Sequence, residues 1–165
     1  MNLYPHQQNI LEALQLNSKG IITSPTGSGK TYTFITDSRR FLTPGKVVVV
    51  VAPQLLLSEQ LFNEFDNHLS DVDFIWRQVS SEGKVFQRDR SKLKFRVTPP
   101  KSSTTTIEEI RESYRIAVKV NKPLILFVTY DSLERIVSSL IPVEAVYYDE
   151  AHNATKSDNF NAVKF

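Results

Sequence analysis

The segment from Val47 to Ala52 constrains the fold most strongly, because it holds five valines in a row followed by an alanine. β-Branched side chains favour extended backbone, and a run of them has no polar side to turn toward water. A strand of this kind is buried on both faces, as in a parallel sheet that is covered by helices. The chain is therefore expected to have an α/β fold.

The rest of the chain alternates short apolar stretches with amphipathic ones. Runs of β-branched and aromatic residues predict buried strands, and apolar residues at spacings of three and four predict helices. We expect further strands at residues 20–23, 73–79, 124–129 and 145–149, and helices at residues 6–16, 32–41, 54–65, 106–118 and 131–140. The helix at 106–118 opens with a T-x-x-E capping box, Thr106 to Glu109. This alternation predicts one three-layer domain over residues 1–165 with a mainly parallel central sheet.

A phosphate-binding loop is predicted between the first of these strands and the second helix, over Ser24-Pro25-Thr26-Gly27-Ser28-Gly29-Lys30-Thr31. Its glycines let backbone N–H groups point at phosphate oxygens beside the positive end of a helix. Lys30 would reach the β- and γ-phosphates, and the Thr31 hydroxyl would bind Mg²⁺. Ser24 stands where the strict pattern has glycine, and the alternative is an ordinary glycine-containing loop with a chance Lys-Thr pair. The expected nucleotide contacts are Thr26, Gly27, Ser28, Gly29, Lys30 and Thr31.

A second motif, Asp149-Glu150-Ala151-His152, follows the predicted strand at 145–149. Ligands of open α/β sheets bind beyond the carboxyl ends of the strands. Asp149 there could hold Mg²⁺, and Glu150 could take a proton from a water that attacks the γ-phosphate. An acidic pair that opens the next helix is the alternative for this motif taken alone.

In their order along the chain, these motifs resemble the first RecA-like domain of superfamily 2 helicases and translocases of the DEAD/DEAH-box type. Leu3, Pro5 and Gln7 match the L-R-P-Y-Q opening, with Tyr4 in place of its arginine. The phosphate loop resembles motif I, which commonly starts with a small residue in this superfamily. Residues 52–60 resemble motif Ia, and residues 128–133 resemble the T-Y-Q-S-L segment. Among subgroups, the pattern is nearest to restriction motors and repair translocases.

The resemblance implies an ATP-dependent helicase or translocase with ATP and Mg²⁺ as cofactors. Lys30, Asp149, Glu150 and His152 would be catalytic, and Thr31 and Asp149 would hold the metal. Gln7 would read the adenine edge, although it could also be a surface residue of the first helical turn. Pro53, Gln54, Thr129 and Tyr130 would contact nucleic acid, with DNA favoured over RNA.

The resemblance also implies a second RecA-like domain in cis, which closes the ATP site in such motors. Residues 153–165 contain neither the S/T-A-T of motif III nor the second domain with its arginine fingers. An arginine finger is worth roughly 10³ to 10⁵ in rate in related enzymes. We therefore expect a domain cut shortly after motif II, which by itself hydrolyses ATP barely above background.

A basic segment at residues 76–101 carries eight basic and two acidic residues in a chain of net charge +2. Arg88, Arg90, Lys92 and Lys94 are the candidate phosphate contacts of this segment, which also contains aromatic residues that could stack on bases. Its alternation of apolar and charged residues is equally typical of a solvated β-hairpin.

Other features of the composition exclude some classes of protein. The chain has no cysteine, which excludes disulfides and cysteine-bound zinc. No apolar run is long enough to span a bilayer, so no membrane partner and a cytoplasmic or nuclear location are expected. His6 and His68 lack partners at metal-ligand spacing. The alternative function is a non-catalytic module that binds nucleotide or nucleic acid and acts through a partner.

Overall fold

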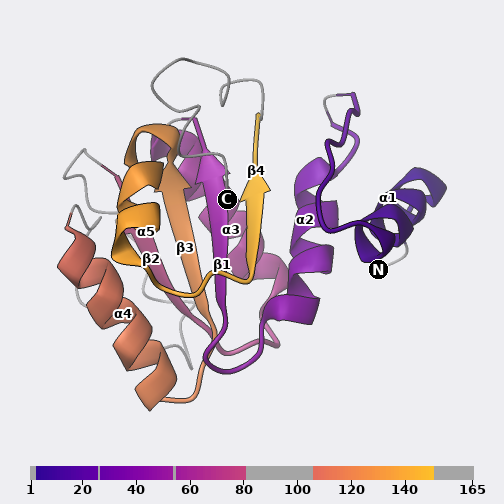
Figure 1. Cartoon of the computed structure of the whole chain (residues 1–165). Helices are drawn as coiled ribbons and strands as arrows, with labels where there is room; N and C mark the ends of the chain where they lie inside the picture. Colours follow the sequence, from indigo (N-terminus) through magenta and orange to yellow (C-terminus); the bar gives the residue numbers. More distant parts are fainter. Residues whose placement is uncertain (1–2, 26, 54, 81–105, 151–165) are drawn as a thin grey trace.

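Strands and helices alternate along the chain, as the sequence pattern predicts (Figure 1). The computed structural model describes residues 3–25, 27–53, 55–80 and 106–150. The strands are β1 (Val47–Ala52), β2 (Ile75–Val79), β3 (Leu124–Thr129) and β4 (Ala145–Tyr148). The helices are α1 (Pro5–Leu16), α2 (Lys30–Ser38), α3 (Leu55–His68), α4 (Ile107–Lys119) and α5 (Leu133–Ser139), with 3-10 turns at Arg39–Phe41 and Tyr130–Ser132.

The strands β1 and β3 lie at the centre of the sheet, whose order among the described residues is β2-β3-β1-β4. All of these pairings are parallel, and in the central pair Val47 lies beside Leu124 and Ala52 beside Thr129. Every residue of β1 and β3 is buried. The two-sided burial predicted for residues 47–52 is thus confirmed, together with the α/β fold and its mainly parallel sheet.

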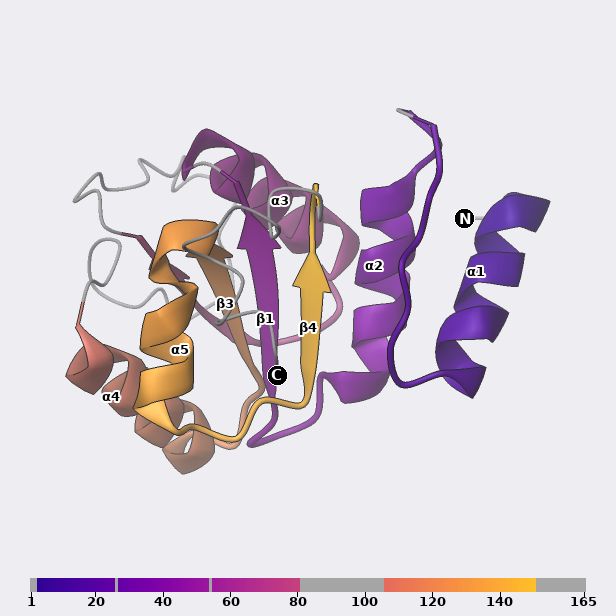
Figure 2. The ribbon, with the colours of Figure 1, turned by 45° about the horizontal axis from the view of Figure 1, so that its top comes forward.

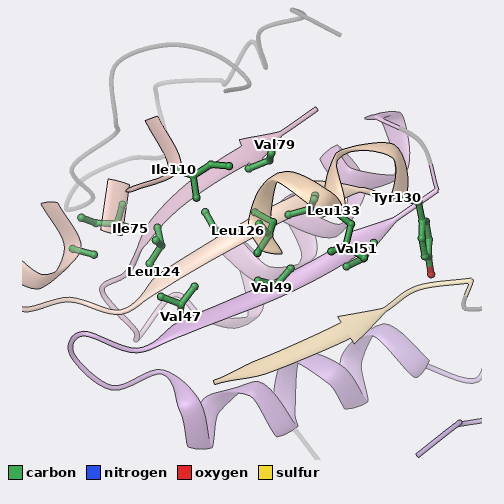
Figure 3. Packing of buried hydrophobic residues seen from close by; sticks show 13 residues of the cluster. Val47, Val49, Val51, Ile75, Val79, Ile110, Leu124, Leu126, Tyr130 and Leu133 are labelled. Atoms are coloured by element: carbon green, nitrogen blue, oxygen red, sulfur yellow. The ribbon is translucent and has the colours of Figure 1, made fainter. Parts of the chain in front are cut away.

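Different helices cover the two faces of the sheet and produce the three layers. Val47, Val49 and Val51 pack on the side of α4 and α5 (Figure 3). Val48 and Val50 point to the other face, where α2 and α3 cover them. The helix α1 lies outside α2, on the side away from the sheet, in both ribbon views (Figures 1 and 2). Within the part of the chain that the structure describes, no helix is long and apolar enough to cross a bilayer.

Most predicted elements are present with small changes at their ends. The capping box of α4 is confirmed, because the Glu109 amide donates to the Thr106 hydroxyl at 3.3 Å. The predicted helix at 131–140 is shorter, since it starts as the 3-10 turn that follows β3. The helix predicted at 32–41 likewise ends in a 3-10 turn.

The strand predicted at 20–23 is wrong. These residues have no regular secondary structure, and Ile21 is 88% exposed. A strand forms only where a neighbouring strand takes up its N–H and C=O groups. None of the described strands lies beside this segment, because β4 ends the sheet on that side. The apolar residues at 20–23 favour a strand, but a short apolar pattern cannot show whether a neighbouring strand will be there to pair with it.

A buried polar contact joins α2 to β4. The Tyr147 hydroxyl donates to the Asp37 carboxylate at 2.6 Å, and Arg40 forms an ion pair with the same carboxylate at 2.9 Å. Asp37 is only 5% exposed. Burial, and then the bond to Asp37, raises the pKa of Tyr147, so its hydroxyl stays protonated and donates at neutral pH. The contact sets the position of β4, which leads to Asp149, against the helix that begins at Lys30.

We expect Tyr147→Phe to lower the free energy of unfolding by about 1–3 kcal/mol, because it takes one hydrogen-bond donor from a buried carboxylate. Tyr148→Phe is the matched control, since the buried Tyr148 hydroxyl has no hydrogen-bond partner among the described residues. Urea unfolding of both variants measures the difference. Equal effects of the two substitutions would contradict a stabilising role for the contact with Asp37.

Candidate nucleotide site

The phosphate loop has the backbone that its glycines predict. Gly27 and Gly29 adopt φ angles of +79° and +81°, a left-handed conformation that side chains rarely allow. A Cβ atom at Gly29 would also collide with the Gln7 side chain amide. Gly29 is the N-cap of α2, so the first amides of this helix and its positive end lie at the loop. This arrangement suits an anion, and phosphate in particular.

The side chains of the loop contact one another. The Lys30 ammonium donates to the Ser24 carbonyl at 2.8 Å, and the Ser24 hydroxyl donates to the Ser28 hydroxyl. Ser24, which departs from the strict glycine pattern, thus supplies both a carbonyl and a hydroxyl to the loop. A phosphate oxygen carries more negative charge than a carbonyl, so Lys30 would gain a stronger bond by exchanging one for the other.

The start of α1 is attached to this loop. The Gln7 side chain is 4% exposed; its oxygen accepts from the Tyr4 amide at 3.0 Å, and its NH₂ donates to the Ser28 carbonyl at 3.2 Å. His6 Nε2 lies 3.0 Å from the same carbonyl and donates to it in the matching tautomer. The sequence pattern gave His6 no partner, because its contact lies 22 positions away. The contact of Gln7 with adenine stays a prediction.

The acidic motif lies where the parallel ladder ends. The Asp149 amide donates to the Val51 carbonyl at 2.8 Å, which extends the pairing of β4 with β1. Glu150 follows with φ +53°, a left-handed conformation that is uncommon for a residue with a side chain. Asp149 and Glu150 therefore leave the sheet through a sharply turned backbone at its carboxyl edge.

The pKa of Asp149 is raised by its surroundings. Burial is the largest cause and the charge of Glu150 the next, while a hydrogen bond from the Glu150 backbone and the positive charge of Lys30 oppose the rise. Asp149 and Glu150 lie at the carboxyl edge of the sheet. Their joining with Lys30 in one nucleotide site stays a prediction.

The oxygen donors here suit a magnesium ion that arrives with a nucleotide. Thr31 occupies the first turn of α2, and Asp149 supplies a carboxylate. Among the described residues, this site included, no cluster of three His, Cys, Asp or Glu could hold a metal. Mg²⁺ at phosphate sites is commonly held by one or two carboxylates together with phosphate oxygens and waters, so such a cluster is not needed.

The predicted nucleic-acid contacts that the structure describes lie along the same edge. Pro53 follows Ala52, which pairs with Thr129, so the ends of β1 and β3 are neighbours. The Thr129 hydroxyl donates to Ser132, and the Tyr130 side chain is 3% exposed. Both side chains point into the protein, and a contact of this segment with nucleic acid stays a prediction.

Several predicted site residues lie outside the described residues: Thr26, Gln54, Arg88, Arg90, Lys92, Lys94 and His152. Of the basic segment 76–101, only residues 76–80 are described. Arg77, its first basic residue, lies against α4 and donates from Nε to the Ser113 hydroxyl at 3.0 Å. Burial lowers the pKa of Arg77, and its contact is with the protein interior.

Comparisons with known proteins agree with this architecture. The model of one protein family, described as the res subunit of type III restriction enzymes (ResIII), matches residues 1–165. No curated protein matches the sequence significantly.

Two solved structures share the fold. One is a nuclease-deletion mutant of the type ISP restriction-modification enzyme LlaGI in complex with a DNA substrate mimic, with a TM-score of 0.70 and 23% identity over 96% of this chain. The other is the ATP-dependent type ISP restriction-modification enzyme LlaBIII bound to DNA, with a TM-score of 0.70 and 21% identity over 98% of this chain. Our chain spans 16% and 11% of those two chains.

The family model covers the chain from its first residue to its last, and the parallel sheet with its phosphate loop matches the fold of both restriction-modification enzymes. The chain therefore belongs to the family of type III restriction enzyme res subunits, and it is a RecA-like domain of the superfamily 2 restriction-motor type.

Proposed function

We propose that this domain is the ATP-binding half of a nucleic-acid-dependent ATPase that couples ATP hydrolysis to movement on DNA. The observation that carries the proposal is the left-handed glycine loop that leads into α2 at Lys30, together with an acidic pair at the carboxyl end of β4. Family membership supports a helicase-type motor. DNA is proposed as the track because both structural neighbours are described as complexes with DNA or a mimic of it.

The residues of the loop would bind and orient the phosphates. Backbone amides at the start of α2 would face the anion, and Lys30 would leave the Ser24 carbonyl to bind the β- and γ-phosphates. Thr31 and Asp149 would hold Mg²⁺, which when bound neutralises charge that develops between these phosphates. Gln7, already attached to Ser28, would place the adenine edge relative to the loop.

Hydrolysis would need an activated water in line with the γ-phosphate. Glu150 would accept a proton from that water as its oxygen bonds to the γ-phosphorus and the bond to the β-phosphate oxygen breaks. Because Glu150 has a left-handed backbone, the chain turns there and no longer follows the direction of β4. His152 would couple the site to a second RecA-like domain in cis, which we propose closes over the nucleotide.

Nucleic acid would lie along the carboxyl edge of β1 and β3, near Pro53 and Thr129. The basic residues Arg88, Arg90, Lys92 and Lys94 would add contacts with phosphates that are independent of base sequence.

Lys30→Ala is expected to weaken ATP binding about 10-fold to 150-fold, the value of a charge-assisted hydrogen bond of about 1.5–3 kcal/mol. Thermal unfolding should stay unchanged, because the Lys30 ammonium bonds to the Ser24 carbonyl of the loop and is not part of the apolar core. Lys46→Ala is the control, since Lys46 pairs with Glu144 at the exposed opposite end of the sheet. Nucleotide affinity and melting temperature are measured together. Wild-type ATP affinity in Lys30→Ala would refute the phosphate-loop assignment.

Glu150→Gln in the complete enzyme is expected to bind Mg-ATP but to lose turnover, because the amide keeps the shape of the side chain and cannot accept the proton. Asp149→Asn should instead weaken binding and its dependence on magnesium. Steady-state ATPase assays and titration with a non-hydrolysable analogue separate the two effects. Hydrolysis at the wild-type rate by Glu150→Gln would show that another group is the base.

The wild-type domain is expected to prefer ATP to GTP, and Gln7→Ala should reduce this preference. An amide left without its partner costs about 1–3 kcal/mol, or roughly fivefold to a hundredfold in affinity. His6→Ala is the matched control: it removes the other bond to Ser28, and it should weaken both nucleotides equally. Equal affinities of the wild type for ATP and GTP would limit Gln7 to its structural contacts.

A further inference from the structure

Tyr130 reaches from the end of β3 to the turn that carries the acidic motif. Its hydroxyl donates to the Asp149 carbonyl at 3.0 Å. Because β1 lies between β3 and β4 in the sheet, the ring crosses the end of β1 to make this contact. Figure 3 shows Tyr130 with its oxygen directed past Val51 toward the chain that follows β4.

The Tyr130 side chain that makes this contact is packed inside the protein. Tyr130 is 3% exposed and belongs to the apolar cluster with Val51 and Leu133. Its ring stacks on that of Tyr148, with centroids 6.2 Å apart.

The accepting carbonyl belongs to the peptide that joins Asp149 to Glu150. Glu150 has φ +53°, and uncommon backbone conformations persist only where the surrounding structure holds them. The Asp149 amide is held by Val51 on one side, and the Asp149 carbonyl is held by Tyr130 on the other. The first bond holds the peptide before the Asp149 Cα, and the bond from Tyr130 holds the peptide after it, from which Glu150 departs.

We propose that Tyr130 is a positioning residue for ATP hydrolysis: its hydroxyl orients the Asp149–Glu150 peptide and so places the Glu150 carboxylate against the attacking water. The inference rests on the proposed role of Glu150 as the base. A positioning role also suits a side chain that is buried, since Tyr130 can hold the Asp149 carbonyl from inside the protein.

The test uses Tyr130→Phe in the complete enzyme, because phenylalanine keeps the ring in the apolar cluster and removes only the hydroxyl. The value of kcat should fall about tenfold to a hundredfold, since small misplacements of catalytic groups cost this much. KM for ATP and the Kd of a non-hydrolysable analogue should stay within about twofold, because Lys30 and the loop are untouched. 4-Aminophenylalanine at position 130 should restore kcat, since its amino group can donate to the same carbonyl.

Tyr148→Phe is the matched control, since it removes a neighbouring buried hydroxyl that has no partner among the described residues. It should leave kcat and KM unchanged. Wild-type kcat in Tyr130→Phe, or a fall no larger than the loss of folded protein, would overturn the role of Tyr130. Glu150→Gln is assayed alongside: if it retains turnover, the proposed base is wrong, whereas its inactivity beside an active Tyr130→Phe refutes only the positioning role.

Discussion

The parallel pairing of β1 with β3 on one side and β4 on the other is the constraint on which the rest of the structure depends. Parallel strands bring their carboxyl ends to one edge, so Ala52, Thr129 and Tyr148 end close together although they are far apart in sequence. The extra bond from the Asp149 amide to Val51 extends this ladder into the acidic motif. The apolar sheet therefore decides where the polar chemistry can lie.

Hydrophobic burial alone does not determine how the phosphate loop lies against this edge. Polar contacts do so at two places. Asp37 accepts from Tyr147 and pairs with Arg40, which joins α2 to β4. The Ser28 carbonyl accepts from Gln7 and lies within hydrogen-bond distance of His6, which joins α1 to the loop. Buried polar groups are costly without partners, so such contacts favour one arrangement over others with equal apolar burial.

The candidate site combines burial with opposing charge. Burial and the charge of Glu150 raise the pKa of Asp149, and a backbone hydrogen bond from Glu150 and the charge of Lys30 only partly oppose the rise. A bound nucleotide would bring negative charge to Lys30, and a divalent cation would then stabilise the ionised form of Asp149. The family match and the fold of the restriction-modification enzymes are consistent with this chemistry, while the activity of the complete protein rests on the experiments above.

The sequence by itself determined the features that depend on local pattern. The valine run predicted β1 with its observed bounds, the T-x-x-E pattern predicted the capping box of α4, and the glycines indicated where the loop can turn tightly. Only the tertiary structure decided that residues 20–23 pair with none of the described strands, that His6 binds the loop, and that Tyr130 holds the Asp149 carbonyl. These outcomes depend on contacts between residues that are far apart in the sequence. Periodicity and short motifs describe neighbouring residues, so they cannot predict such contacts.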